Sequence, residues 1–188
     1  MGLIGIEVGE RFLAYVTQRL LNRLEGLRDE EYLWEPTTPA WSIRPGDDGR
    51  WHPDLGPKGS TATPVSPVPF TTIAWRLWHL GASPNPTWPP HSPPTARDLL
   101  EGWVNQRPQS SAEAVPDAAT ACRLLGDHWM GFARAVSAMP DDDLLSAMGP
   151  VAGPWAESTI LGLLLHIGDE LVHHSAEVGV LRDLYQHQ

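Results

Sequence analysis

The stretch from Ile160 to Tyr185 decides the fold, and it reads ILGLLLHIGDELVHHSAEVGVLRDLY. Its apolar residues recur at three- and four-residue spacing, which predicts one long amphipathic helix from about Glu157 to Tyr185. The apolar stripe of this helix consists of Ile160, Leu163, Leu164, Ile167, Leu171, Val178 and Leu181. Helices that could pack against this stripe are indicated at three other places in the chain.

Residues 6–28 show the same periodicity and predict a first helix. A second helix is expected to begin after Thr71 or Thr72, either of which could be its N-cap, and to stop at Ser83. Residues 116–138 predict a third helix, with Pro116 in its first turn. Four long helices of similar length imply an all-α fold, a four-helix bundle that forms a single domain over residues 1–188.

Two Pro-rich segments separate these helices, residues 36–69 and residues 84–115. The chain has 19 prolines, which favour long irregular connections, and we expect no series of strands. The first segment is expected to be an ordered loop, because Trp41 and Trp51 can anchor it. The second could contain a short helix within residues 95–107. Both are long enough to cover the mouth of the bundle and to shape a substrate pocket.

Composition excludes several classes of protein. The net charge of -10 argues against binding to nucleic acid, which requires clustered Lys and Arg. No apolar run approaches the ~20 residues that a membrane span requires, and the first residues lack the pattern of a signal peptide. Cys122 is the only cysteine, so we expect no internal disulfide, a buried thiol and a cytoplasmic protein.

The predicted last helix also carries metal-ligating side chains at helical spacing. His166, Glu170 and His174 follow one another at four-residue intervals, which places them along one stripe. A catalytic zinc site uses three protein ligands and leaves one position open. Glu170 and His174 supply two, and a third must come from another helix. His79 is the leading candidate, because it stands where the second helix would otherwise present a core residue.

Two segments resemble the DinB/YfiT-like superfamily of metal-binding helical bundles. They are Thr-Ile-Ala-Trp-Arg-Leu-Trp-His, ending at His79, and Leu-Leu-His-Ile-x-x-Glu-x-x-x-His-His, ending at His174. Members usually carry His-x-x-x-His on the later helix, and Glu170 replaces the first of that pair here. The His/Glu/His version resembles the branch of mycothiol-dependent maleylpyruvate isomerases. This resemblance implies that His79, Glu170 and His174 are the metal ligands and that mycothiol is a co-substrate.

Other residues remain alternatives to this set. His166 could replace His79 as a ligand, or it could donate a hydrogen bond to a ligand. His128 could face the cavity, although a core role is more typical. Asp169 or Glu177 could orient a ligating imidazole, whereas His173 is expected at the surface. Arg76 and Arg182 could bind a substrate carboxylate, but surface roles are favoured. Most tryptophans are expected in the core, among them Trp34, Trp75, Trp78, Trp129 and Trp155.

The predicted site suits three functions. A divalent metal, zinc or else nickel, could deprotonate a small thiol for addition to an electrophile, which is the reaction that the resemblance implies. The same metal could activate water in a hydrolase. A bundle with a structural metal or a bound ligand would be non-enzymatic, and a fourth protein ligand would favour it. We expect a small-molecule substrate, no nucleic-acid or membrane partner, and a chain that could pair as a homodimer.

Overall fold

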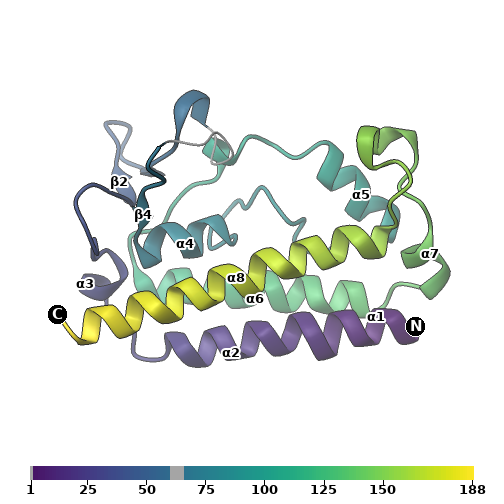
Figure 1. Ribbon diagram of the computed structural model, residues 1–188, viewed down its shortest axis with the longest axis horizontal. Coiled ribbons are helices and arrows are strands. Elements are labelled where there is room, and N and C mark those ends of the chain that lie inside the picture. Colours follow the sequence, from purple (N-terminus) through teal and green to yellow (C-terminus); the bar gives the residue numbers. More distant parts are fainter. Residues whose placement is uncertain (1, 60–65) are drawn as a thin grey trace.

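The computed structural model describes residues 2–59 and 66–188, and it is mostly helical, with the two termini at opposite ends of the long axis (Figure 1). The elements, in chain order, are α1 (Leu3–Ile6), η1 (Glu7–Ala14), α2 (Tyr15–Leu24), α3 (Asp29–Tyr32), β1 (Ala40–Trp41), β2 (Ile43–Pro45), β3 (Trp51–Pro53), η2 (Pro57–Gly59), β4 (Phe70–Thr71), α4 (Ile73–His79), α5 (Ala96–Val104), η3 (Gln109–Ser111), α6 (Ala118–Ser137), α7 (Asp141–Leu145), η4 (Pro150–Trp155) and α8 (Ile160–Gln186). Within the described part of the chain, none of these helices combines the length and apolarity needed to cross a bilayer.

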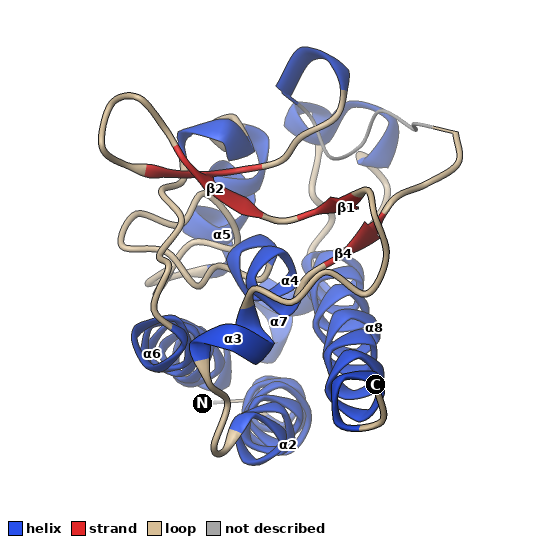
Figure 2. Ribbon diagram, turned by 90° about the vertical axis from the view of Figure 1, so that its left-hand side faces the viewer, coloured by secondary structure: helices blue, strands red, loops and turns tan. Residues whose placement is uncertain are grey.

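Four helical segments surround the core. The first is continuous through α1, η1 and α2, because the backbone keeps right-handed helical angles at both junctions, and η1 is a π-helical stretch within it. This rod contacts α6 and α8, and α4 in turn contacts both α6 and α8 (Figure 2). The expectation of four helices of similar length is not met, because α4 has only seven residues. It ends at His79, shortly before Gly81 turns the chain with a φ of 93°.

Side-chain caps fix where three of these helices begin. The hydroxyl of Thr72 accepts a hydrogen bond from the N–H of Trp75 at 3.2 Å, as predicted for α4. Asp117 caps α6 by accepting from the N–H of Thr120 at 2.6 Å, so Pro116 precedes the helix instead of standing in its first turn. Thr159 caps α8 in the same way. The first helix ends at Leu24, earlier than predicted, because Gly26 takes a φ of 71°.

The segment between α3 and α4 contains short strands that the sequence pattern did not indicate. Strands β1 and β4 pair in parallel, and β2 and β3 form an antiparallel pair. These strands lie over α4 (Figure 2). Trp41 and Trp51 pack against the core from this layer, as expected of anchors. Part of the predicted loop, residues 60–65, lies outside the described residues. The second Pro-rich segment contains α5, where a short helix was expected.

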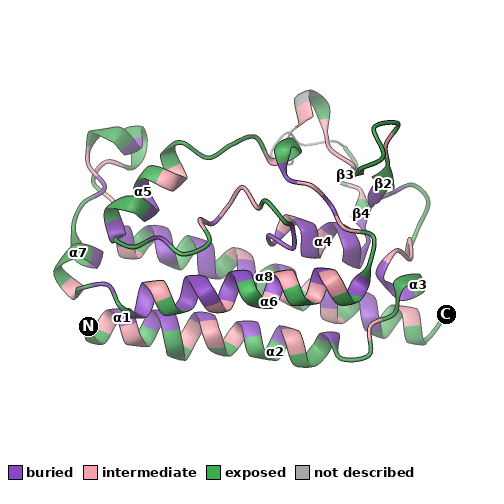
Figure 3. Cartoon of the chain, turned by 180° about the vertical axis from the view of Figure 1, so that it is seen from behind, coloured by how far each residue is buried: buried purple, intermediate pink, exposed green. Residues whose placement is uncertain are grey.

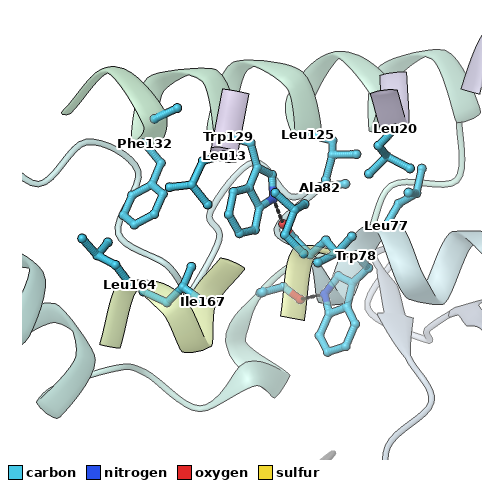
Figure 4. Close-up of a cluster of buried hydrophobic side chains, with 14 of the residues drawn as sticks. Leu13, Leu20, Leu77, Trp78, Ala82, Leu125, Trp129, Phe132, Leu164 and Ile167 are labelled. Carbon is cyan, nitrogen blue, oxygen red and sulfur yellow. Dashed lines mark hydrogen bonds between the residues drawn. The ribbon is translucent and has the colours of Figure 1, made fainter. Parts of the chain in front are cut away.

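The core lies between the helices, whose outer faces are exposed (Figure 3). Two buried indoles connect helices to loops by hydrogen bonds as well as by packing (Figure 4). Trp129 Nε1 donates to the carbonyl of Leu80 at 2.8 Å, and Trp78 Nε1 donates to the carbonyl of Ala112 at 3.1 Å. Each bond satisfies the polar end of a large apolar side chain; the first holds the turn after α4 in place, and the second ties α4 to the segment before α6.

Glycines allow the N-terminal rod to lie directly on α6. A Cβ at Gly5 would be 2.9 Å from the carbonyl oxygens of Val136 and Met139. A Cβ at Gly9 would collide with Ser137 Oγ and the carbonyl of Ala133. The two backbones therefore touch where any other residue would separate them.

A buried ion pair joins the far end of α8 to α3 and to the end of α2. Arg182 Nε donates to Glu31 Oε1 at 2.7 Å, and Arg182 Nη2 donates to Oε2 at 3.1 Å. Arg182 Nη1 also donates to the carbonyls of Arg23 and Glu25. The surface or substrate-binding roles considered for Arg182 are therefore wrong, because its side chain is only 9% exposed and fully engaged.

We expect Glu31→Gln to lower the free energy of unfolding by about 3–5 kcal/mol, because it leaves the Arg182 guanidinium buried without its counter-charge. Urea unfolding measures the loss. Glu101→Gln is the matched control, since it breaks an exposed ion pair with Arg97 and should cost less than about 0.5 kcal/mol. Equal effects of the two substitutions would contradict this assignment.

Candidate metal centre

The three predicted ligand residues come together where α4 lies against α8. His79 is the last residue of α4, and Glu170 and His174 stand one turn apart in the middle of α8. Their ligand atoms all lie within 4.8 Å of one another. His174 Nε2 is 3.3 Å from Glu170 Oε2, and His79 Nε2 is 3.7 Å from the same oxygen. Two imidazoles from different helices thus point at one carboxylate oxygen.

His79 is held by ring contacts. Its imidazole stacks on Trp75, with centroids 5.1 Å apart and an interplanar angle of 10°, and meets His174 edge-on at 4.8 Å. Its Nδ1 atom is buried and has no hydrogen-bond partner among the described residues. The Trp75 indole donates to the carbonyl of Asp54 at 2.8 Å, which fixes the surface on which His79 rests.

His174 is oriented by a carboxylate on its own helix. Its Nδ1–H donates to Glu177 Oε2 at 2.6 Å, so Nε2 is the nitrogen left facing Glu170 and His79. Arg76 of α4 holds that carboxylate in turn: Nη2 donates to Oε1 at 3.1 Å, while Nε lies 2.9 Å from Oε2 at an angle that gives an ion pair but no hydrogen bond. Glu177 therefore takes the orienting role considered for it, and Arg76 is a paired residue in the interior, not a surface one.

Burial and pairing set the protonation of these groups. Burial lowers the pKa of His79 below its ordinary value, which favours the neutral imidazole. Burial also acts to lower the pKa of His174, but its hydrogen bonds to Glu170 and Glu177 outweigh that effect and raise it. His174 and then His79 hold the pKa of Glu170 far below its usual range. In the described arrangement Glu170 is therefore an anion facing two imidazoles.

The three groups lie in the wall of a cavity of about 500 Å³. Trp75, Trp78 and Trp129 form part of this wall from the helical core. The segment 84–115 contributes a further part, as predicted, through Pro86–Pro89, Trp103, Gln106, Gln109 and Ala112. None of the described residues of the segment 36–69 lines the cavity, so the pocket-shaping role expected of that segment is not seen in its described part. Glu170 keeps 40% of its side chain exposed, so the group is open to the cavity.

The alternative histidines do not join this group. His166 lines the same cavity one turn before Glu170, but it is exposed and belongs to no described set of three ligand atoms. His173 is exposed, as expected, with Nε2 3.8 Å from Glu177 Oε1. Two further sets of potential ligands overlap the first, and both contain the exposed His173. The set with His79 is the one that combines two helices, burial and a cavity.

Two other residues differ from the roles considered for them. Cys122 is half-buried, and burial raises the pKa of its thiol to about 11, so it remains protonated at neutral pH. Trp155, expected in the core, is 59% exposed in η4. Trp88 also lines the cavity, although it was not singled out from the sequence. It lies in the second Pro-rich segment, where no periodic pattern could have identified it.

His128 is a core residue, the role that is more typical of a lone histidine on a helix. It is 2% exposed on α6, and neither ring nitrogen has a hydrogen-bond partner among the described residues. Its ring packs beside Gly81 and 5.6 Å from the ring of His91. Burial, with a smaller contribution from His91, lowers the pKa of His128 to about 4.

This burial makes His128 a source of acid sensitivity. An unfolded His128 binds a proton as pH falls through 6.5, whereas the folded protein resists until about pH 4. Stability is therefore present above pH 6.5 and is lost below it. We expect His128→Leu to gain about 2 kcal/mol over the parent chain between pH 7 and pH 5 in urea unfolding. His187→Gln, at an exposed histidine, should show no such gain, and a parallel pH dependence of all three proteins would contradict the prediction.

Comparison with models of protein families identifies the family of this chain. The family model of the DinB superfamily matches residues 13–178, a span that includes His79, Glu170 and His174. Comparisons with curated proteins and with solved structures gave no match. The family model covers most of the chain and both helices of the site, and candidate His/Glu metal sites are a feature that the structure shares with this class. The chain belongs to the DinB superfamily.

Proposed function

We propose that this protein is a divalent metal-dependent enzyme that transfers or adds a low-molecular-weight thiol, of the mycothiol type, to a small electrophilic substrate. The observation that carries the proposal is the convergence of His79 Nε2, Glu170 Oε2 and His174 Nε2 in the wall of a cavity. Neither the thiol nor the metal follows from family membership alone, and pairing of two chains stays a prediction.

The donor set fits a zinc ion. Ligand atoms at zinc bond lengths of 2.0–2.1 Å in tetrahedral directions lie about 3.3 Å apart. The separations of the two imidazole nitrogens from Glu170 Oε2, 3.3 Å and 3.7 Å, are close to this value. Two imidazoles and one carboxylate suit zinc best, and nickel second. Three protein ligands, with no fourth among the described residues of the group, favour a catalytic site over a structural one.

A bound divalent ion with an open position lowers the pKa of a thiol or a water that reaches it. The chain's own residues orient and shield that position. Glu177 keeps His174 in the tautomer whose Nε2 faces the site, and Trp75 keeps the His79 ring in place. The tryptophan side chains surround that position with apolar surface, which strengthens electrostatic interactions within the cavity.

Thiol chemistry is favoured over hydrolysis by what the wall contains. Among the described lining residues, Glu170 is the only carboxylate, so no second one is available as a general base for water. A thiol needs less help, because its ordinary pKa is much lower than that of water. A hydrolase remains the second candidate, because His166 lines the cavity and could accept a proton.

Metal content tests the ligand set. We expect untagged protein to hold about one zinc or nickel per chain by elemental mass spectrometry, and His79→Ala, Glu170→Ala and His174→Ala each to lose it. His166→Ala is the control, since it alters the same cavity and should retain the metal. Full metal content in all three ligand variants would exclude this set.

Turnover tests the reaction. The assay uses mycothiol as the thiol and monochlorobimane as the electrophile. Glu170→Ala should lower kcat/KM by at least about 100-fold, which is more than is typical for loss of a residue that only hydrogen-bonds to a metal ligand. Hydrolysis of 4-nitrophenyl acetate that needs metal but no thiol, together with no thiol conjugation, would favour the hydrolase instead.

The hydrogen bond from His174 to Glu177 should tune metal affinity. We expect Glu177→Gln to weaken zinc binding about 10–100-fold in a chelator competition, because the imidazole loses its anionic partner. Asp169→Asn removes the same charge from the same helix without touching a His174 hydrogen bond, so it should have little effect. A larger loss with Asp169→Asn would instead favour the exposed set of Asp169, Glu170 and His173.

A further inference from the structure

Five of the nine tryptophans line the one cavity that contains His79, Glu170 and His174, and they fall into two groups. Trp75, Trp78 and Trp129 are at most 3% exposed, and each donates its indole N–H to a backbone carbonyl. Each also contacts other rings. Their packing and hydrogen-bonding capacity is used by the fold.

Trp88 and Trp103 differ from these three. Both are half-buried and line the cavity from the segment between α4 and α6. Within the described part of the chain, neither indole has a ring contact or a hydrogen bond to its N–H. A tryptophan that serves packing usually satisfies its N–H, and paired aromatic rings are more stable than rings without partners. Both side chains pack in part against the core, and the rest of each ring, with an N–H that bonds to no described residue, is available to whatever enters the cavity.

The stretch around Trp88 and the helix α5 that carries Trp103 are fixed relative to each other. Arg107 Nη2, just after α5, donates to the carbonyls of Asn85 and Pro86 at 3.1 Å and 3.4 Å. Gly102, next to Trp103, packs so closely on Pro90 that a Cβ there would be 3.1 Å from the proline ring. The aromatic surface is thus formed before any ligand arrives, which reduces the entropy lost on binding.

Charge limits what can lie against these walls. The charged side chains lining the cavity in its described part are Arg76 and Glu170, apart from histidines. Arg76 is already paired with Glu177, and Glu170 faces His79 and His174. No unpaired arginine or lysine among the described lining residues is therefore left to hold an anionic group away from the metal site.

We propose that the substrate carries an uncharged, planar aromatic ring, which binds against Trp88 and Trp103 while its reactive end reaches the His79, Glu170 and His174 group. This inference rests on the proposed function, because it names the substrate class of the same cavity. The cavity volume of about 500 Å³ accommodates a bicyclic ring beside a second small reactant.

Calorimetric titration at pH 7 of the full-length protein, incubated with zinc and then desalted, tests the ring preference. The probes are 2-naphthol and trans-decahydro-2-naphthol, which share a carbon skeleton and a hydroxyl but differ in planarity and π electrons. We expect one naphthol per chain, bound at least about tenfold more tightly than the saturated alcohol. Trp88→Leu and Trp103→Leu should each reduce this ratio severalfold, and Trp155→Leu, at an exposed indole outside the cavity, should leave it unchanged.

Two further variants and one separate measurement keep the outcomes distinct. Trp88→Phe and Trp103→Phe retain a ring and should retain most of the preference, so they decide the matter if a leucine variant does not fold. Equal affinities of the parent chain for the two alcohols, or a preference unchanged in every Trp88 and Trp103 variant, would overturn the inference. Metal content is measured on the same samples: naphthol preference without metal uptake would refute the proposed function alone, and metal uptake without preference would refute this inference alone.

Discussion

The ion pair between Arg76 and Glu177 sets the register on which the site depends. Arg76 stands three residues before His79 on α4, and Glu177 stands three residues after His174 on α8. The two helices run in opposite directions at this point. Once Arg76 and Glu177 are paired, the next turn of each helix therefore brings His79 beside His174 and Glu170. The same carboxylate also orients His174, so one side chain aligns the helices and selects the nitrogen that faces the site.

Local patterns in the sequence were enough to single out the three candidate ligand residues, and they suggested Glu177 as a partner for an imidazole, but they did not reveal that Arg76 pairs with Glu177. Glu170 and His174 are recognisable because a four-residue interval on a helix makes two heads converge. His79 followed from the need for a ligand on a second helix. The link from Arg76 to Glu177 spans 101 residues, and nothing in either local pattern predicts it. The same holds for Trp88 and Trp103, whose meeting in one cavity depends on the tertiary path of a segment without periodicity.

The helices themselves were predictable to different degrees for physical reasons. The Thr72 cap of α4 was predicted from the sequence, whereas the Asp117 and Thr159 caps were not, so the starts of α6 and α8 were each placed slightly too early. Where apolar periodicity continues past a glycine, the end was placed too late: Gly26 and Gly81 take positive φ values that stop the rod. The short strands near α4 were missed because two or three residues are too few for alternation to appear.

The contact of Gly5 and Gly9 with α6 has a bearing on protein engineering. Alanine normally strengthens a helix by about 1 kcal/mol relative to glycine, so a consensus or propensity-guided redesign would replace both residues. Here the added methyl groups would meet the backbone of α6, and at Gly9 also Ser137 Oγ, and the neighbouring helix would have to retreat. Thermostabilisation of this chain should therefore target exposed helical positions and leave this glycine pair untouched.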